Sequence, residues 1–330
     1  MNWNGRRVLV TGSEGFIGSH LVERLLELGA SVRAFVLYNS FNHWGWLEEV
    51  STEAMRGVEI FGGDVRDEER VAKAAEGMDA IMHLAALIAI PYSYHAPASY
   101  VATNVSGTLN VLQAARRHGT KSVVITSTSE VYGSAQFVPI TEQHPLVGQS
   151  PYAATKIAAD QLAISFHRSF DLPVSILRPF NTFGPRQSAR AVIPTVMTQA
   201  LSGRREIRVG STHTTRDFTF VKDTVEGFVK IADCREAIGQ VVNLGANREI
   251  SIGDLVQRIG AVVGVPLTVV TEDERKRPEK SEVERLWSDN AKARALMGWE
   301  PRHSLDDGLR LTADWLRKNL GAYKDKIYNL

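Results

Sequence analysis

The sequence predicts an α/β protein with a doubly wound parallel sheet and a smaller C-terminal α/β lobe. Strand patterns alternate with helical patterns through the first half of the chain, which is typical of a parallel sheet covered on both faces. The expected strands are residues 7–11, 32–37, 58–63, 80–86, 121–126 and 173–178. Glycines follow the first strand, where such sheets often hold a ligand. Beyond residue 187 the alternation gives way to short elements and charged loops.

The length of 330 residues exceeds the usual size of a single core. We therefore expect residues 1–177 to form the sheet domain, with segments near 218–245 returning to it. Residues 178–330 are expected to form the lobe. Within these domains we expect a loop at 87–100, a helix at 104–118 and a frayed tail at 322–330.

The composition excludes several classes of protein. A formal net charge of +1 favours neither nucleic acid nor an anionic membrane surface as a partner. The single cysteine, Cys234, excludes an internal disulfide framework and a cysteine-rich metal site, so we expect no metal. No apolar run approaches the roughly 18 residues of a membrane span, and the N-terminus has no signal-peptide apolar region. We expect a cytoplasmic protein without a membrane or nucleic-acid partner.

The first strand leads into a turn that contains Gly12, Gly15 and Gly18. Glycines there let the backbone approach a pyrophosphate, toward which the N–H groups of the following helix point. The spacing is three and three, whereas the common dinucleotide fingerprint is G-x-G-x-x-G. A tight strand–helix turn without a ligand is the alternative. The usual acidic residue for the adenosine ribose is missing from 35–40, which also lacks arginine, so the choice between NAD and NADP stays open.

Further candidate ligand contacts follow the later strands. Asp64 can reach an adenine amine or, alternatively, cap the helix that starts near Glu68. Ala85 and Ala86 are small enough for a cofactor to pass closely. His83 is expected to be a packed strand residue and not a ligand. Because ligands of parallel sheets bind beyond the carboxyl ends of the strands, these segments are expected to meet at one edge.

A proton-transfer site is predicted from two segments. The strand at 122–126 ends in a row of hydroxyls and one carboxylate, Thr126–Glu130. Downstream, Ser150 suits a helix N-cap and Pro151 the first helical position. Tyr152 and Lys156 are then four residues apart and share a helix face. A phenol beside an ammonium, facing hydroxyls and a carboxylate, indicates proton transfer.

The lobe carries several arginines that suit a second diphosphate through bidentate contacts. Solvated surface arginines are the alternative interpretation. The candidates are Arg186, Arg190, Arg216, Arg277 and Arg285.

Taken together, the motifs resemble those of the extended short-chain dehydrogenase/reductases, the NAD-dependent epimerase/dehydratase family. They are Thr11-Gly12-x-x-Gly15-x-x-Gly18, Asp64-x-x-Asp67, His83-Leu84-Ala85-Ala86, Ser127-Thr128-Ser129-Glu130-Val131-Tyr132-Gly133 and Tyr152-x-x-x-Lys156. Residues 32–46, 149–152 and 187–194 resemble a narrower group. That group is the bacterial NDP-N-acetylglucosamine 4,6-dehydratases of the legionaminic-acid type.

The resemblance implies a Rossmann-type domain that holds NAD, with NADP not excluded, and a lobe that binds a nucleotide sugar. It also implies a homodimer formed by the helices near 104–118 and 151–168. The implied cofactor contacts are Gly12, Gly15, Phe16, Ile17, Gly18, Asp64, Val65, Leu84, Ala85, Ala86, Asn104, Tyr152 and Lys156. The implied substrate contacts are Asn181, Arg190, Arg216 and Arg277.

The implied catalytic residues are Tyr152, Lys156, Thr128, Ser129 and Glu130. Tyr152 would take the proton of the sugar C4 hydroxyl, and Lys156 with the cofactor's charge would lower the pKa of the phenol. Thr128, or Ser127, would bond the same oxygen. Glu130 would take the C5 proton before water leaves C6, and hydride return to C6 would complete a 4,6-dehydration.

Ser129 departs from the pattern of the dTDP-glucose 4,6-dehydratases, which carry an aspartate acid at this place. Either Glu130 performs both proton transfers or another group helps. The same Thr-Ser-Glu sequence occurs in UDP-glucuronate decarboxylases, which are one alternative. A 5,6-dehydratase and a 4-epimerase are others, and a non-catalytic dinucleotide-sensing protein is a remote one.

Overall fold

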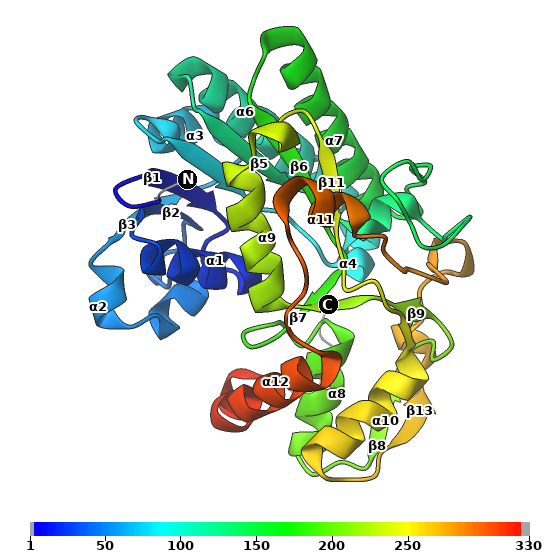
Figure 1. Cartoon of the computed structure of the whole chain (residues 1–330). Helices are drawn as coiled ribbons and strands as arrows, with labels where there is room; N and C mark the ends of the chain where they lie inside the picture. Colours follow the sequence, from blue (N-terminus) through cyan, green and yellow to red (C-terminus); the bar gives the residue numbers. More distant parts are fainter. Residues whose placement is uncertain (1–2, 325–330) are drawn as a thin grey trace.

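The computed structural model describes residues 3–324, and its centre is a parallel sheet of seven strands (Figure 1). The strand order is β11-β6-β5-β4-β1-β2-β3, and all six neighbouring pairs are parallel. The strands are β1 (Arg7–Thr11), β2 (Ser31–Leu37), β3 (Val58–Gly63), β4 (Ala80–His83), β5 (Ser122–Thr126), β6 (Val174–Pro179) and β11 (Val241–Leu244). The order reverses between β1 and β4, which is where doubly wound sheets bind their ligands. The predicted fold class is confirmed.

Helices cover both faces of this sheet. One face carries α1 (Phe16–Glu27) and α9 (Val221–Asp233), which pack against each other. The other face carries α3 (Glu68–Ala75), α6 (Gly107–His118) and α7 (Pro151–Phe170). The strands bury side chains on both sides, Val8 and Val10 toward the first layer and Leu9 toward the second. Each fully buried side chain of this kind contributes about 1.5–3 kcal/mol.

The seventh strand comes from far along the chain. β11 pairs with β6 in the register Val241↔Ile176, and α9 precedes it on the sheet face. Residues between β6 and α9 therefore leave the sheet region and the chain then returns to it. The exact domain boundary at 177/178 stays a prediction.

The remaining elements form the smaller lobe, below the sheet in Figure 1. Its helices α8 (Val192–Leu201), α10 (Ile252–Val263) and α12 (Leu305–Asn319) contact one another. Three two-stranded sheets accompany them: β7 (Asn181–Phe183) with β10 (Phe218–Phe220), β8 (Glu206–Val209) with β13 (Thr268–Thr271), and β9 (Thr215–Arg216) with β12 (Ile250–Ser251). Two short helices, α2 (Thr52–Met55) and α11 (Ala291–Met297), lie outside these groups.

Three predicted elements differ in the structure. The loop predicted at 87–100 is wrong, because α4 (Ile90–His95) and α5 (Pro97–Tyr100) lie there. Both have proline in the first turn, where its missing N–H costs nothing. The helix predicted from residue 104 begins earlier, as a π-helical stretch over Val101–Ser106 that runs into α6. The strand predicted at 80–86 is shorter, because β4 ends at His83.

No helix within residues 3–324 is long and apolar enough to cross a membrane. Most of the predicted frayed tail, residues 325–330, lies outside the described residues. At its start, Tyr323 packs against Trp46 and Trp315.

Candidate active site

A cavity of about 1010 Å³ opens where the carboxyl ends of the strands meet the lobe. Its walls come from the glycine turn, the ends of β2 to β6, α4 and the lobe segments around β7, α8 and β9. The predicted site residues other than Asn104 line this cavity. Segments more than two hundred residues apart in the chain thus supply one site.

The glycine turn has the shape that a pyrophosphate requires. Gly12 has φ +67°, and a Cβ there would lie 2.8 Å from the Ala85 nitrogen. A Cβ at Gly18 would lie 2.1 Å from the Gly12 carbonyl oxygen, so α1 packs directly onto the turn. Gly15 precedes α1 with no side-chain cap among the described residues, which leaves the first N–H groups to a ligand at the cavity. These residues fit a dinucleotide.

Helix α7 carries Tyr152 and Lys156 into the cavity as predicted. The Ser150 hydroxyl accepts a hydrogen bond from the Ala153 N–H at 3.1 Å, and Pro151 takes the first position. Both Tyr152 and Lys156 are buried. The Lys156 ammonium donates to the Thr126 carbonyl at the end of β5, which ties the helix to the strand.

Burial controls the proton affinities of this pair. It raises the pKa of Tyr152, and the Glu130 charge adds to the effect, while a hydrogen bond with Thr128 opposes it. Burial also lowers the pKa of Lys156 to about 8, against the attraction of Asp160. The expectation of a lowered phenol pKa is therefore not met by the protein groups alone. Desolvation disfavours the phenolate more strongly than the surrounding groups stabilise it.

A buried ion pair supports the site from below. Asp160, one turn after Lys156, accepts hydrogen bonds from Arg178 at 2.8 Å and from the Ser127 hydroxyl at 2.7 Å. Arg178 also donates to the Tyr132 hydroxyl at 2.9 Å. The Ser127 hydroxyl is therefore engaged in a hydrogen bond to Asp160. Thr128, the other hydroxyl expected to bond the substrate oxygen, forms a hydrogen bond with Tyr152.

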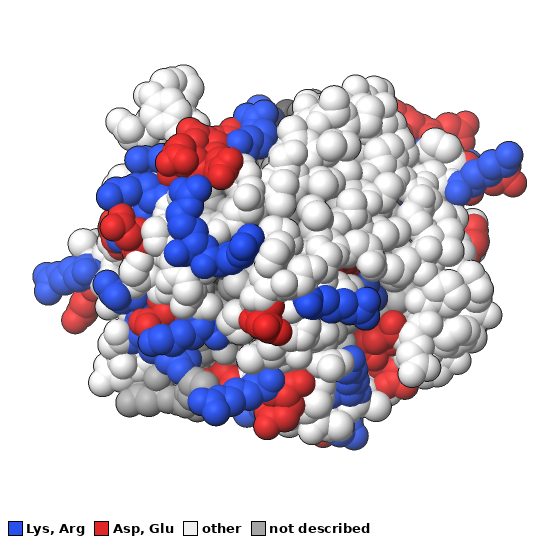
Figure 2. Space-filling model, turned by 90° about the horizontal axis from the view of Figure 1, so that it is seen from above, with Lys and Arg blue, Asp and Glu red and all other residues white. Residues whose placement is uncertain are grey.

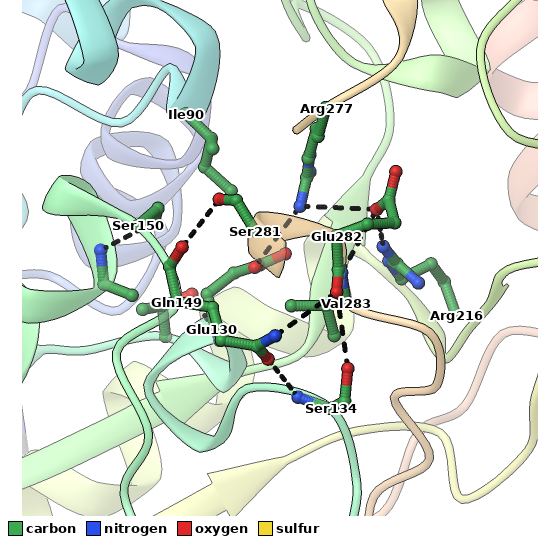
Figure 3. A network of polar contacts seen from close by, with 12 residues as sticks. Ile90, Glu130, Ser134, Gln149, Ser150, Arg216, Arg277, Ser281, Glu282 and Val283 are labelled. Carbon is green, nitrogen blue, oxygen red and sulfur yellow. Dashed lines mark hydrogen bonds and ion pairs between the residues drawn. The ribbon is translucent and has the colours of Figure 1, made fainter. Parts of the chain in front are cut away.

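Glu130 lies in a 3-10 turn over Ser129–Tyr132, and both Ser129 and Glu130 are buried. Figure 3 shows Arg277 between two carboxylates, Glu130 and Glu282. Its Nη1 atom is 3.5 Å from Glu130 Oε2 and 3.9 Å from Glu282 Oε1. Arg216 reaches the same Glu282 oxygen at 3.4 Å. Two arginines from the lobe thus lie beside the predicted base.

The five lobe arginines have different roles. Arg190, Arg216 and Arg277 line the cavity. Arg186 also borders it, but its guanidinium pairs with Glu23 of α1 at 2.8 and 2.9 Å. Arg285 pairs with Glu249 and is not among the residues that line the cavity. For the last two, the structure favours a structural role over diphosphate binding.

Asn104 is the predicted cofactor residue that the structure places elsewhere. Its amide accepts from the Leu87 N–H at 2.9 Å, and donates to the Leu87 carbonyl at 2.9 Å and to Thr155 at 3.1 Å. Its side chain is thus fully used in joining the segment after β4 to α7. It positions the cavity wall and does not line it.

Several lining residues were missed in the sequence. Glu14 lies within the glycine turn, Ile90 and Tyr92 come from α4, and Glu282 comes from a surface segment far from Arg216. Among them only Glu14 carried a signal in the sequence, because an acid stands inside a glycine turn where small or apolar residues are expected. For Glu282 the sequence holds no signal, because its partner is 66 residues away and joined only by the tertiary fold.

The parallel sheet, the glycine turn at its reversal point and the Tyr152–Lys156 pair define a dinucleotide-dependent dehydrogenase/reductase of the extended short-chain class. The sequence comparison identifies the family within that class. A family model described as GDP-mannose 4,6 dehydratase matches residues 9–312, and the chain belongs to this family. This confirms the resemblance seen in the motifs.

Individual relatives include both dehydratases and epimerases. A dTDP-glucose 4,6-dehydratase of Streptomyces antibioticus is 33% identical over 316 residues, covering 94% of this chain and 92% of the relative. A UDP-glucose 4-epimerase of Mycolicibacterium smegmatis is 35% identical over 317 residues, covering 94% and 98%. The structure of a dTDP-glucose 4,6-dehydratase from Streptomyces venezuelae, solved with NAD bound, has a TM-score of 0.86 at 31% identity and covers 96% of this chain and 99% of its own.

Proposed function

We propose that this protein is an NAD-dependent nucleotide-sugar 4,6-dehydratase that acts on a nucleotide-linked N-acetylglucosamine. The observation that carries the proposal is the meeting of Tyr152, Thr128 and Glu130 in one cavity with lobe arginines. A phenol can serve oxidation at C4 and a carboxylate can serve elimination at C5 and C6. Relatives that include dTDP-glucose 4,6-dehydratases support the reaction class.

The glycine turn and the ends of β3 and β4 would hold the cofactor. Gly12, Gly15 and the start of α1 suit its pyrophosphate, and Ala85 and Ala86 form a wall of small side chains. When bound, NAD would accept hydride from C4 and return it to C6. Solved relatives that hold NAD support this choice.

Tyr152 would take the proton of the C4 hydroxyl. Thr128 would orient the phenol and the substrate oxygen, since its hydroxyl already bonds Tyr152. The Lys156 ammonium, fixed on the Thr126 carbonyl, would place positive charge below the reacting groups. A protonated Lys156 and a positively charged cofactor would together counter the desolvation that raises the pKa of the phenol.

Glu130 would then remove the C5 proton, which a 4-keto group acidifies. Ser129 is a poor acid at neutral pH, so we assign both proton transfers of the elimination to Glu130. It would take the proton from C5 and deliver it to the departing C6 hydroxyl. When hydride returns to C6, a proton from solvent would reach C5 through Glu130, and Tyr152 would release the C4 proton to solvent. Arg277, at 3.5 Å, would hold this carboxylate in position.

The substrate's diphosphate would lie against Arg190, Arg216 and Arg277, with Asn181 nearby on the cavity wall. Arg216 and Arg277 already share a carboxylate partner, Glu282. Two guanidinium groups directed at one acidic group form a geometry that suits diphosphate oxygens.

A homodimer joined through α6 and α7 is supported by the composition of these helices. Residues 101–115 carry no charged side chain, and in 151–167 the only Asp, Glu, Lys or Arg are Lys156 and Asp160, both buried. Figure 2 shows a broad area without these residue types on the face seen from above, the side on which α6 and α7 lie in Figure 1. The single free cysteine, Cys234, suits the reducing cytoplasm, where we propose the enzyme acts.

The second candidate function is 4-epimerisation, favoured by the relatives that are UDP-sugar 4-epimerases. Product mass separates the candidates. Incubation with a panel of nucleotide sugars should yield a product lighter by one water. A product lighter by carbon dioxide would indicate decarboxylation, and an isomer of unchanged mass would indicate epimerisation.

Glu130→Gln should stop the reaction after C4 oxidation, because an amide cannot take the C5 proton. Reduced nicotinamide should accumulate by absorbance while dehydrated product falls by about 100-fold or more. Glu279→Gln is the matched control, since it makes the same charge change on an exposed residue of the segment that also carries Arg277. Normal product formation by Glu130→Gln would show that the base is another group.

A further inference from the structure

Beside the glycine turn, Glu14 presents an incompletely bonded carboxylate at the cofactor cavity. One oxygen, Oε1, accepts a hydrogen bond from the Leu37 N–H at the end of β2, at 2.9 Å. The other, Oε2, is buried and has no hydrogen-bond partner within residues 3–324. Leaving such an oxygen unpaired costs free energy, so the site is built for a donor that the protein itself does not supply.

The neighbouring polar groups are already used. At the end of β2, the Asn39 side chain accepts from the His43 N–H at 3.1 Å and donates to its carbonyl at 2.8 Å. Arg66, the nearby basic residue, has its Nε 3.0 Å from both oxygens of Asp64. This pair is neutral overall. Glu14 itself forms no ion pair within residues 3–324, so no described cation compensates its charge.

The backbone of Glu14 is held by the neighbouring segment at Gly45 and Trp46. Its own carbonyl accepts from the Trp46 N–H at 3.0 Å, and a Cβ on Gly45 would lie 2.5 Å from the same oxygen. Leu37, Gly45, Asp64 and Glu14 all line the cavity. The end of β2 is where a dinucleotide of a doubly wound sheet places its adenosine ribose, and the acid expected there is missing from 35–40.

We propose that Glu14 binds the adenosine ribose in place of the acid that is missing from the end of β2. Its carboxylate would accept hydrogen bonds from the ribose hydroxyls and exclude a nucleotide that carries a 2′-phosphate. A phosphate would bring about two negative charges next to a half-buried carboxylate, and the repulsion between like charges would weaken binding of such a nucleotide. The protein would thus select NAD over NADP through the glycine turn. The inference rests on the proposed function, since it assumes that the cavity holds a nicotinamide dinucleotide.

The test measures nucleotide binding without turnover. Purified wild-type protein is denatured and the released nucleotides are identified by mass spectrometry, which should find NAD. Apo-protein is then titrated with NAD and with NADP by calorimetry, and NAD should bind at least about 100-fold more tightly. In Glu14→Gln, which retains an acceptor for the Leu37 N–H, NAD should bind about tenfold more weakly and the preference should fall by about tenfold or more.

Glu48→Gln is the control, because Glu48 is an exposed acid of the segment after Gly45 and Trp46 and does not line the cavity. Its nucleotide preference should equal that of the wild type. Equal binding of NAD and NADP by the wild type, or an unchanged preference in Glu14→Gln, would overturn the role of Glu14. Failure of the wild type to bind either nucleotide would overturn the proposed function itself, and the inference with it.

Discussion

At the scale of residues, the proposed chemistry centres on the Tyr152 hydroxyl. It is buried, packs edge-on against Tyr100 with ring centroids 6.3 Å apart, and bonds Thr128. Because burial raises its pKa, the proposed role of Tyr152 as proton acceptor would depend on positive charge brought by the cofactor.

Tyr152→Phe should lower turnover by about 100-fold to 10,000-fold, because the ring remains but the proton acceptor is gone. The content of bound NAD, released and measured by mass, should stay unchanged. Tyr38→Phe removes an exposed hydroxyl that does not line the cavity and should retain activity. A Tyr152→Phe enzyme with the wild-type rate would contradict the assignment.

His83 should make stability depend on pH. Burial, with the nearby Lys156 charge, lowers the pKa of His83 to about 3, whereas an unfolded histidine titrates near 6.5. The unfolded chain therefore binds more protons between these values. The stabilising contribution is complete above pH 6.5 and is lost as pH falls toward 3, at about 1.4 kcal/mol per pH unit.

Urea unfolding at pH 7 and pH 5 should detect about 2 kcal/mol of this loss. His83→Gln should show a smaller loss over the same range, since it has no group to protonate. His213→Gln, at an exposed site, should behave as the wild type does. Equal pH dependence in His83→Gln and the wild type would show that other groups control acid stability.

At the scale of elements, α7 carries both the proposed catalytic pair and a buried ion pair that holds the helix on the sheet. Its first turn presents Tyr152 and Lys156, and its next turn presents Asp160 to Arg178 and Ser127. Any movement of the helix start would therefore shift the phenol from Thr128. The cap at Ser150 sets where the helix begins.

Ser150→Ala should destabilise the protein by about 1 kcal/mol, because the Ala153 N–H loses its acceptor. Chemical unfolding measures this change in the free energy of unfolding. A fall in kcat with little change in KM would indicate that the start of α7 has moved. Ser165→Ala, farther along the same helix and exposed, should change stability by less than about 0.5 kcal/mol. If Ser150→Ala is as stable as the wild type, contacts other than the Ser150 cap determine where α7 begins.

At the scale of the whole molecule, the cavity exists because the lobe returns over the sheet edge. Arg186 of the lobe side pairs with Glu23 of α1, and Ser281 bonds both Tyr94 and the Gln149 carbonyl. These contacts join the glycine-turn side of the cavity to the lobe side. They also place Arg277 beside Glu130.

Assembly is testable at the same scale. Ala158→Arg, on the outer side of α7, should convert a dimer into a monomer in sedimentation velocity, because it places a charge in an apolar helix bundle. Ala261→Arg, at an exposed position of α10, should leave the dimer intact. A dimer that persists in Ala158→Arg would place the interface elsewhere.

Much of the fold was predictable because its signals are local. The strands, the glycine turn and the cap of α7 follow from hydrophobic pattern, backbone freedom and hydrogen-bonding side chains close in sequence. The segment 87–100 was not, because its two short helices depend on packing of Ile90 and Tyr100 against Tyr152. Short helices have little intrinsic stability, so tertiary contacts decide them.

The sequence by itself determined the sheet, the family and the Tyr152–Lys156 pair, since these rest on spacings within one segment. Only the tertiary structure decided that Ser127 serves Asp160, that Asn104 supports the wall, and that Glu282 shares the two arginines. It also left the buried Oε2 atom of Glu14 without a hydrogen-bond partner within residues 3–324. Hydrogen bonds and ion pairs between distant segments depend on ångström-scale placement, which residue order does not encode locally.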